Sequence, residues 1–264
     1  MTPLLAIQEN LVPGASVAER MAAAVAAGFD GLEVRDADVA RRPELASAGG
    51  AIPTCCPEAD GFVADFDPAG RRRALEGLRR QLDGIAALGG HGVIAPAAWG
   101  MWTNRLPPFA PPPRTPEEDR AVLVEQLAAL GAHAEAAGVV LLLEPLNRYE
   151  DHMVNTVAQA ASLVRSAGSG GVRVLADTYH MNIEEDDLCA ALRAAAPVLG
   201  AVHLSDSNRH HPGRGHVDFA AVLATLRGSG FTGTLSVECR PRGELGAELT
   251  ACGTFLRGLL DGWG

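Results

Sequence analysis

Three carboxylates and one histidine lie at the carboxyl ends of four successive apolar runs in the second half of the chain. Glu144 follows "VVLLL", Asp177 follows "VRVLA", His203 lies within "GAVHLS" and Glu238 follows "GTLSV". A buried, ionised carboxylate without a compensating charge costs on the order of tens of kcal/mol in the idealised limit. Glu144 in particular therefore needs a proton, a cation or a metal ion.

These four side chains could bind one divalent metal ion if the fold gathers the ends of the runs. Three carboxylates and one imidazole suit Mn²⁺, Mg²⁺ or Co²⁺ better than a thiolate-preferring metal. Each residue alone also has an ordinary explanation, such as an ion pair, a helix cap or a core histidine. The recurrence on four successive runs favours a metal site formed by Glu144, Asp177, His203 and Glu238.

Short aliphatic runs and amphipathic segments alternate along the whole chain, which predicts alternating strands and helices. The predicted strands are residues 4–7, 31–34, 51–55, 92–95, 139–144, 172–177, 200–205 and 233–238. The predicted helices are residues 16–27, 68–88, 115–137, 156–167, 187–196, 218–228 and 244–260. The segment after the second strand has the weakest helical pattern.

Eight β/α units in 264 residues are typical of an α/β protein with a (β/α)₈ TIM barrel. We predict a single domain that fills residues 1–264. A doubly wound sheet is the alternative, because periodicity does not show whether a sheet closes. In a closed barrel the carboxyl ends of neighbouring strands point into one mouth, which would bring the four candidate ligands together.

A proline-rich insertion at residues 95–120 separates the fourth predicted strand from its helix. It contains seven prolines and two tryptophans, Trp99 and Trp102. As a β-to-α loop it would lie at the ligand-binding face of a barrel and could serve as a lid; the alternative is a rigid surface loop. The tryptophans could form an apolar wall against a substrate or pack within the core or lid.

The composition of the chain argues against several classes of function. The formal net charge is −10, and the one dense basic stretch, residues 71–80, falls on a helical pattern and is expected to be solvated, so a nucleic-acid partner is disfavoured. No apolar run is long enough to cross a bilayer and no secretory signal precedes the first strand, which indicates a cytoplasmic protein. Five cysteines without a CxxC motif indicate reduced thiols, of which Cys55 and Cys56 could line a pocket.

Several stretches of the chain resemble a known family. They are "EPLNRYEDHMVNT", "ADTYHMNIEEDD", "VHLSDSNRHHPGRG" and "SVE", with weaker agreement in "GFDGLEVR". These stretches resemble the sugar epimerases related to D-tagatose 3-epimerase and D-psicose 3-epimerase, within the xylose-isomerase-like TIM barrel superfamily of sugar phosphate isomerases and epimerases. Unlike those epimerases, the chain has no Tyr or Trp in its first strand, which leaves the substrate open.

The resemblance implies roles for individual residues. Glu144, Asp177, His203 and Glu238 would bind one divalent metal, most plausibly Mn²⁺, and Glu144 and Glu238 would also form an acid/base pair. Contacts with substrate oxygens are implied for three residues: Glu150, His180 and Arg209. Alternatives for these three are a partner of Arg148, a cap of the short helix that follows the sixth strand, and a solvated loop charge.

Together these inferences give the hypothesis of a metal-dependent ketose 3-epimerase. A proton would leave C3 of an open-chain ketose on one face and return on the other, through a metal-stabilised enediolate. No GxGxxG or GxxxxGK[ST] motif is present, so no nucleotide cofactor is expected. The alternatives on the same metal site are an aldose–ketose or hydroxypyruvate-type isomerase and an inosose dehydratase-like enzyme. A non-catalytic sugar-binding barrel is a further alternative.

DNA-repair enzymes of the endonuclease IV type share the barrel and the stretch "HLSDSNRHH". They require an Asp where this chain has Asn208 and histidines after the second and third strands, where it has none. DNA cleavage is therefore disfavoured, and a small sugar is the expected partner. Relatives commonly form homodimers or homotetramers, which the sequence does not resolve.

Overall fold

The computed structural model describes residues 2–58, 60–101 and 111–263. Its core is one parallel sheet with the strand order β2-β1-β8-β7-β6-β5-β4-β3. The strands are β1 Leu5–Gln8, β2 Gly31–Glu33, β3 Thr54–Cys55, β4 Gly92–Pro96, β5 Val140–Glu144, β6 Val172–Asp177, β7 Leu199–Leu204 and β8 Thr234–Val237. The outermost strands of this order, β2 and β3, meet through two isolated parallel bridges, Gly31 with Ala51 and Val34 with Cys55.

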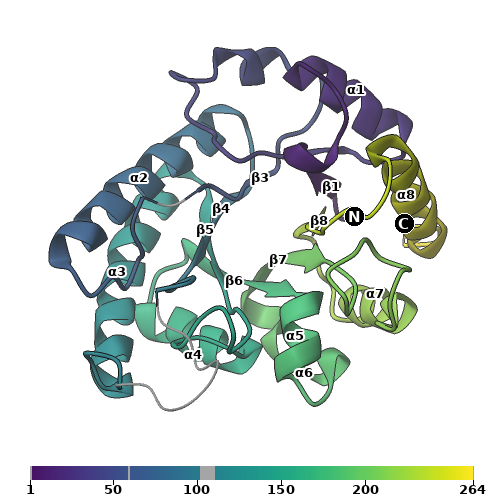
Figure 1. Cartoon of the computed structure of the whole chain (residues 1–264). Helices are drawn as coiled ribbons and strands as arrows, with labels where there is room; N and C mark the ends of the chain where they lie inside the picture. Colours follow the sequence, from purple (N-terminus) through teal and green to yellow (C-terminus); the bar gives the residue numbers. More distant parts are fainter. Residues whose placement is uncertain (1, 59, 102–110, 264) are drawn as a thin grey trace.

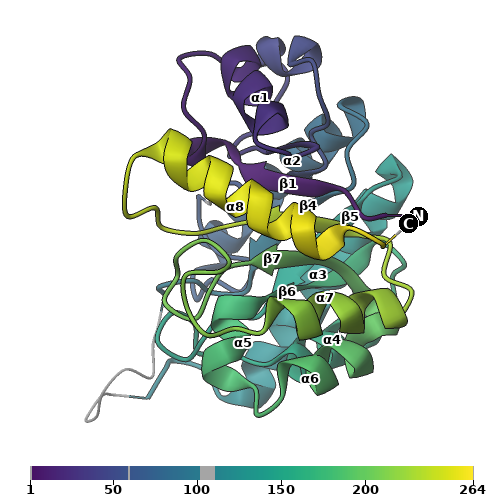
Figure 2. The same ribbon diagram turned by 90° about the vertical axis from the view of Figure 1, so that its right-hand side faces the viewer.

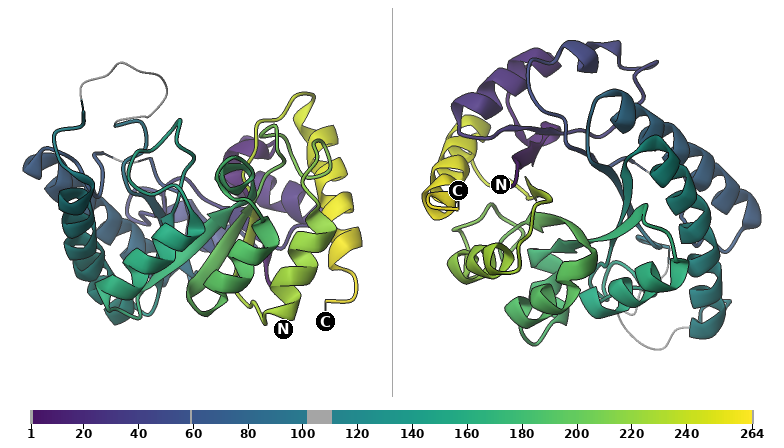
Figure 3. Two further views of the ribbon diagram at one scale, coloured as in Figure 1. Left: turned by 90° about the horizontal axis from the view of Figure 1, so that it is seen from below. Right: turned by 180° about the vertical axis from the view of Figure 1, so that it is seen from behind.

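The nearly closed ring confirms the predicted (β/α)₈ barrel and shows that a doubly wound sheet is wrong. Figure 1 shows the helices surrounding the strands, and Figures 2 and 3 show the two termini close together. The α-helices are α1 Val17–Ala26, α2 Pro68–Ala87, α3 Pro116–Ala137, α4 Val157–Ala167, α5 Thr178–Glu184, α6 Leu188–Ala195, α7 Phe219–Gly228 and α8 Leu245–Leu260.

Local sequence explains where these helices begin. Ser16, Thr115 and Thr156 each form a capping box, in which the hydroxyl accepts a hydrogen bond from the third helical residue and that residue's side chain accepts one in return. Gly138 and Gly168 end α3 and α4 in the left-handed conformation that glycine adopts without steric cost. The predicted helix boundaries are therefore correct to within one or two residues.

Three elements differ from the pattern of strands and helices that the sequence predicts. Between β2 and β3, where every residue is described, the chain forms only a 3₁₀ helix, Pro43–Ser47, in place of an α-helix. The third strand is only Thr54–Cys55, shorter than the predicted 51–55. A short helix, α5, begins directly after β6, because the Asp177 carboxylate accepts hydrogen bonds from the backbone N–H groups of Tyr179 and His180.

The barrel interior is filled by a small apolar layer from four neighbouring strands. Its members are Ile94, Leu142, Leu175 and Ala201. Side chains alternate across a strand with a period of two, so the residues two positions further along face the same interior. Glu144, Asp177 and His203 are those residues on β5, β6 and β7, and they form the next layer toward the carboxyl-terminal mouth.

Candidate metal centre and active site

The four candidate ligands lie together in the barrel mouth. One donor atom from each of Glu144, Asp177, His203 and Glu238 lies within 4.8 Å of the others. The first three are buried, and the Glu238 side chain is 19% exposed. Glu238 follows the last residue of β8, Val237, so it stands at the rim of the mouth, where a substrate could reach it.

His203 lies at the centre of this cluster with a different environment at each ring nitrogen. Its Nδ1 lies 2.8 Å from Glu238 Oε2 and 3.3 Å from Glu144 Oε1. Its Nε2 lies 3.1 Å from Glu33 Oε2, on β2 across the barrel. A carboxylate that orients the far nitrogen of a metal-binding histidine is common at metal sites, and it leaves Nδ1 directed at the other three ligands.

The two carboxylate oxygens of Asp177 have different partners, one in helix α5 and one in the cluster. Its Oδ1 accepts the capping hydrogen bond from Tyr179 at 2.7 Å. Its Oδ2 lies 2.6 Å from Arg209 Nη1 and 3.7 Å from His203 Nδ1. The helix-cap explanation of Asp177 is therefore correct, and it leaves the second oxygen directed into the cluster.

A divalent cation fits this donor set on three grounds. Glu144 Oε1 and His203 Nδ1 are fully buried, and neither has a hydrogen-bond partner in the described part of the chain. Such buried polar atoms are costly unless something else satisfies them. Three carboxylates surround the single guanidinium of Arg209, so the cluster carries excess negative charge that a divalent cation would offset. All four donors are also of the types that Mn²⁺, Mg²⁺ and Co²⁺ accept.

The two candidate acid/base residues have pKa values displaced in opposite directions. Burial raises the pKa of the Glu144 carboxyl, an effect that His203 only partly offsets. Burial acts in the same direction on Glu238, but Arg209 and His203 outweigh it and hold the Glu238 pKa well below its usual range. Two carboxyl groups whose environments separate their pKa values are typical of an acid and a base that work together.

Three residues predicted to contact the substrate, His180, Glu150 and Trp99, belong to one hydrogen-bonded group. Asn147 bonds to His180 and Glu150, and Glu150 in turn bonds to Trp99. The Asn147 backbone N–H donates to His180 Nδ1 at 3.1 Å, and its side-chain Nδ2 donates to Glu150 Oε1 at 3.0 Å. The Trp99 indole N–H donates to Glu150 Oε2 at 3.3 Å, although the Trp99 side chain is 58% exposed.

The fourth predicted substrate contact, Arg209, lies among the candidate ligands. Its guanidinium is 2.6 Å from Asp177 Oδ2 and 2.9 Å from Glu238 Oε2, and it lies over the Tyr179 ring. Its φ of 62° makes it the one non-glycine residue with a left-handed backbone in the described part of the chain. Arg209 is therefore a partly buried, ion-paired charge of the cluster, and the explanation as a solvated loop charge is wrong.

The remaining predictions from the sequence have separate outcomes. Arg148 pairs with Glu184 at 2.8 Å, so the alternative that Glu150 serves as the partner of Arg148 is wrong. Cys56 packs against the apolar layer of the barrel interior and accepts a hydrogen bond from Arg35. Residues 102–110 of the 95–120 insertion, which include Trp102, lie outside the described residues, so the lid stays a prediction. No helix in the described residues is long and apolar enough to cross a membrane.

Sequence reasoning missed Glu33. Its fully buried carboxylate accepts hydrogen bonds from Gln8 Nε2 at 3.1 Å and Thr54 Oγ1 at 2.8 Å, in addition to its contact with His203. The signal was available, because Glu33 ends the short apolar run "GL" of the second predicted strand just as Glu144 ends "VVLLL". We infer that Glu33 positions His203 for metal binding.

Glu33→Gln is expected to weaken Mn²⁺ binding roughly 10- to 100-fold, the usual loss when a partner of a metal-binding histidine is changed. The amide keeps the size of the side chain but lacks the negative charge next to His203 Nε2. Calorimetric titration with Mn²⁺ measures the effect, with Glu125→Gln on the exposed side of α3 as the matched control. A folded Glu33→Gln protein with unchanged Mn²⁺ affinity would show that Glu33 has no part in metal binding.

The comparisons with known proteins agree with this geometry. The family described as xylose isomerase-like TIM barrel matches residues 21–253. The chain is 40% identical over 222 residues to 3-dehydro-D-guloside 4-epimerase of Escherichia coli K12, covering 82% of this chain and 84% of that one. It is 32% identical over 234 residues to D-psicose 3-epimerase of Agrobacterium fabrum, covering 84% and 79%. The solved structure of E. coli 3-keto-D-glucoside 4-epimerase superposes with a TM-score of 0.90 at 36% identity, covering 97% and 98%.

The chain therefore belongs to the xylose isomerase-like TIM barrel family. Within that family, the relatives and the solved structure described above are named as sugar epimerases. The predicted resemblance to the ketose 3-epimerases is confirmed at the level of the family.

Proposed function

We propose that this chain is a metal-dependent epimerase that inverts the carbon next to the ketone of a sugar. The observation that carries the proposal is the cluster of Glu144, Asp177, His203 and Glu238 in one barrel mouth, which places two glutamates at one candidate metal centre. Such a cluster can bind a divalent cation and still supply a base and an acid.

The chemistry of the residues follows from their positions. A divalent cation at the four ligands would act as a Lewis acid on the ketone and hydroxyl oxygens of the substrate. One of Glu144 and Glu238 removes the proton from the carbon next to the ketone, and the other returns a proton to the opposite face. Arg209 contacts Glu238 and can therefore bind substrate oxygens at this pair. His180, Glu150 and Trp99, which form one hydrogen-bonded group with Asn147, would supply further contacts with the substrate.

Two substrate types satisfy this chemistry. One is a free ketose inverted at C3, as the names of the D-psicose and L-ribulose 3-epimerase relatives suggest. The other is a 3-keto-glycoside inverted at C4, as the names of the relatives with 40% sequence identity and with a TM-score of 0.90 suggest. Both reactions remove a proton from a carbon next to a ketone, so the same residues serve either. The higher similarity favours the keto-glycoside.

The rival reactions on the same site give different products. An aldose–ketose or hydroxypyruvate-type isomerase moves a proton between C1 and C2, and a relative named putative hydroxypyruvate isomerase is 29% identical over 250 residues. An inosose dehydratase-like enzyme would release water. Product structure therefore separates these alternatives from an epimerase.

A panel of substrates tests the proposed function. The protein with Mn²⁺ is incubated with free ketoses, such as D-psicose, D-tagatose and L-ribulose, and with 3-keto-glycosides, and the products are identified by NMR. We expect a product that differs from its substrate only in the configuration of one carbon next to the ketone. Formation of an aldose or of a dehydrated product, or no turnover of any sugar in the panel, would contradict the proposal.

A further inference from the structure

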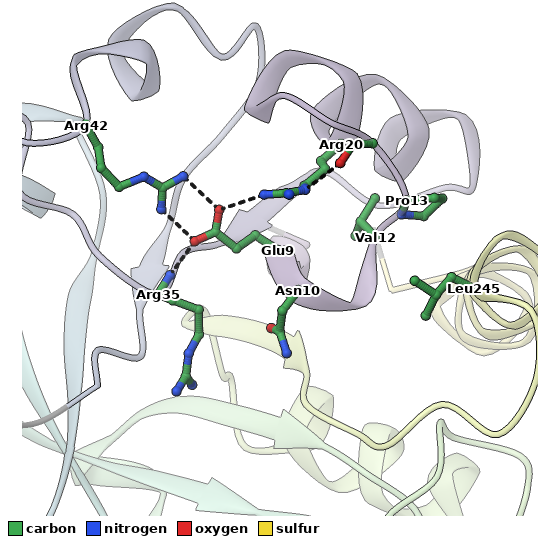
Figure 4. Close-up of a pocket in the computed structure, with 9 residues that line it drawn as sticks. Glu9, Asn10, Val12, Pro13, Arg20, Arg35, Arg42 and Leu245 are labelled. Carbon is green, nitrogen blue, oxygen red and sulfur yellow. Dashed lines mark hydrogen bonds and ion pairs between the residues drawn. The ribbon is translucent and has the colours of Figure 1, made fainter.

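A cavity of about 460 Å³ lies at the carboxyl-terminal ends of β1 and β2. This volume is in the range of small-molecule sites. Its polar lining comes from Glu9, Asn10, Arg20, Arg35 and Arg42, and apolar side chains from the loop after β1 and the start of α8 complete the wall. Figure 4 shows the guanidinium groups of Arg42 and Arg20 directed at the Glu9 carboxylate. Apart from Arg35, which donates to Cys56, none of the residues that line the cavity belongs to the site described above.

The cavity opens on the same edge of the barrel as the metal centre. Glu9 and Asn10 directly follow β1, and Arg35 lies two residues beyond the end of β2. Arg35 links the two sites, because its Nη1 donates to Cys56 Sγ at 3.4 Å. Burial works against charge on Arg35, but Cys56 and the carboxylates of Glu238, Glu58 and Glu33 together raise the pKa of its guanidinium.

Glu9 fixes the cavity wall. Its buried carboxylate accepts from Arg42 Nη1 at 2.6 Å and Nη2 at 2.9 Å, from the Arg35 backbone N–H at 2.8 Å, and lies 3.8 Å from Arg20. Arg42 also donates to Glu44 at 3.1 Å. Arg42 therefore serves to hold Glu9, and its donors are largely used within the protein.

The Arg35 guanidinium, in contrast, has donors to spare. Its five N–H bonds have one hydrogen-bond acceptor among the described residues, the weakly accepting Cys56 sulfur, and the nearest carboxylate is Glu58 at 3.9 Å, whose side chain is 89% exposed. The exposed Asn10 amide has no hydrogen-bond partner in the described part of the chain. In Figure 4 the side chains of Asn10 and Arg35 extend to the same side of the cavity.

We propose that this cavity binds the part of the keto-sugar substrate that lies beyond the reacting carbons, an oxygen-rich substituent that accepts hydrogen bonds from Arg35 and Asn10. The inference rests on the proposed function, since it extends the substrate from the metal centre toward the ends of β1 and β2. A free ketose leaves the cavity without a ligand, whereas a glycoside or a sugar carrying a carboxylate fills it. The chain therefore prefers an extended keto-sugar to a single free ketose.

The ratio of kcat/KM for an extended substrate to that for a free ketose tests this subsite. A 3-keto-glycoside, the same compound with a carboxylate on its substituent, and a free ketose are assayed with each variant. Arg35→Met is expected to lower the ratio roughly 10- to 100-fold, and Asn10→Ala roughly 2- to 10-fold, both mainly through KM. Loss of the Arg35 charge near Glu238 changes the reaction of all three substrates alike, so the ratio isolates binding in the cavity.

A control variant and the comparison between substrates distinguish a specific effect of Arg35 from a general effect of losing an arginine. Arg41→Met, an exposed arginine of the same loop, is expected to keep the wild-type ratio. A larger loss for the carboxylate-bearing substrate identifies an anionic substituent, and an equal loss identifies a neutral one; both support the subsite. A ratio for Arg35→Met within twofold of wild type would overturn it.

Binding without turnover distinguishes failure of the subsite from failure of the proposed function. Calorimetry with the non-reacting sugars cellobiose and glucose is expected to show tighter binding of the disaccharide, and Arg35→Met should abolish that difference. If this holds while no keto-sugar is converted, the proposed function fails and the subsite stands. If wild type binds both sugars equally, the subsite is wrong.

Discussion

Glu238→Gln is expected to lower the kcat for epimerisation roughly 100- to 10,000-fold, the usual contribution of a positioned acid or base. The amide retains the shape of the side chain but neither removes nor returns a proton. Glu144 keeps its carboxylate in this variant, so it can still exchange the substrate proton on its own face. We therefore expect deuterium uptake from D₂O without inversion, in only one of the two epimers.

Glu144→Gln is expected to give the mirror result, with uptake in the other epimer only. NMR of the sugars after incubation in D₂O measures both variants, with Glu76→Gln on the exposed face of α2 as the matched control. Because Glu144 and Glu238 are also candidate ligands, bound Mn²⁺ is measured for each variant in parallel. Wild-type inversion by either variant would show that the two glutamates are not an acid/base pair.

Asp177→Asn is expected to remove the metal while leaving the fold intact. Asn caps helices as well as Asp does, so the hydrogen bonds that begin α5 are retained, and only the charge that faces His203 and Arg209 is lost. Loss of a ligand should exceed the effect of changing its partners, so Mn²⁺ affinity is expected to fall more than about 100-fold.

Thermal unfolding with and without Mn²⁺ gives an independent measurement. A ligand at a concentration of 100 Kd stabilises the folded state by about 2.7 kcal/mol, so the wild-type unfolding temperature should rise on adding Mn²⁺. Asp177→Asn should show no such rise at the same Mn²⁺ concentration and should have no epimerase activity. Equal stabilisation of the variant and the wild type would exclude Asp177 as a ligand.

The barrel could be predicted from the alternation of aliphatic runs and helical segments, and the metal centre from the polar residues at the ends of those runs. The alternation that buries Leu142, Leu175 and Ala201 also directs Glu144, Asp177 and His203 inward two residues later. The candidate ligands are 33, 26 and 35 residues apart along the chain. A closed parallel sheet brings residues this far apart in the sequence close together in space. Predicting the fold was therefore sufficient to predict the cluster.

Other features depend on contacts that no local pattern records. Glu33 reaches His203 across 170 residues of sequence, and its role follows only once β2 and β7 are placed in one ring. Arg209 looks like a loop charge until the loop after β7 folds back over Asp177 and Glu238. The segment after β2 forms a 3₁₀ helix that begins at Pro43, where the sequence pattern was weakest.

Deuterium incorporation by the wild-type protein with Mn²⁺ in D₂O is the most direct test of the proposed chemistry. The proposal predicts a product with one deuterium on the carbon next to the ketone and with inverted configuration at that carbon. An aldose labelled at C1 or C2, or an inverted product without deuterium, would contradict the proposal that one of Glu144 and Glu238 removes the substrate proton and the other returns a proton to the opposite face.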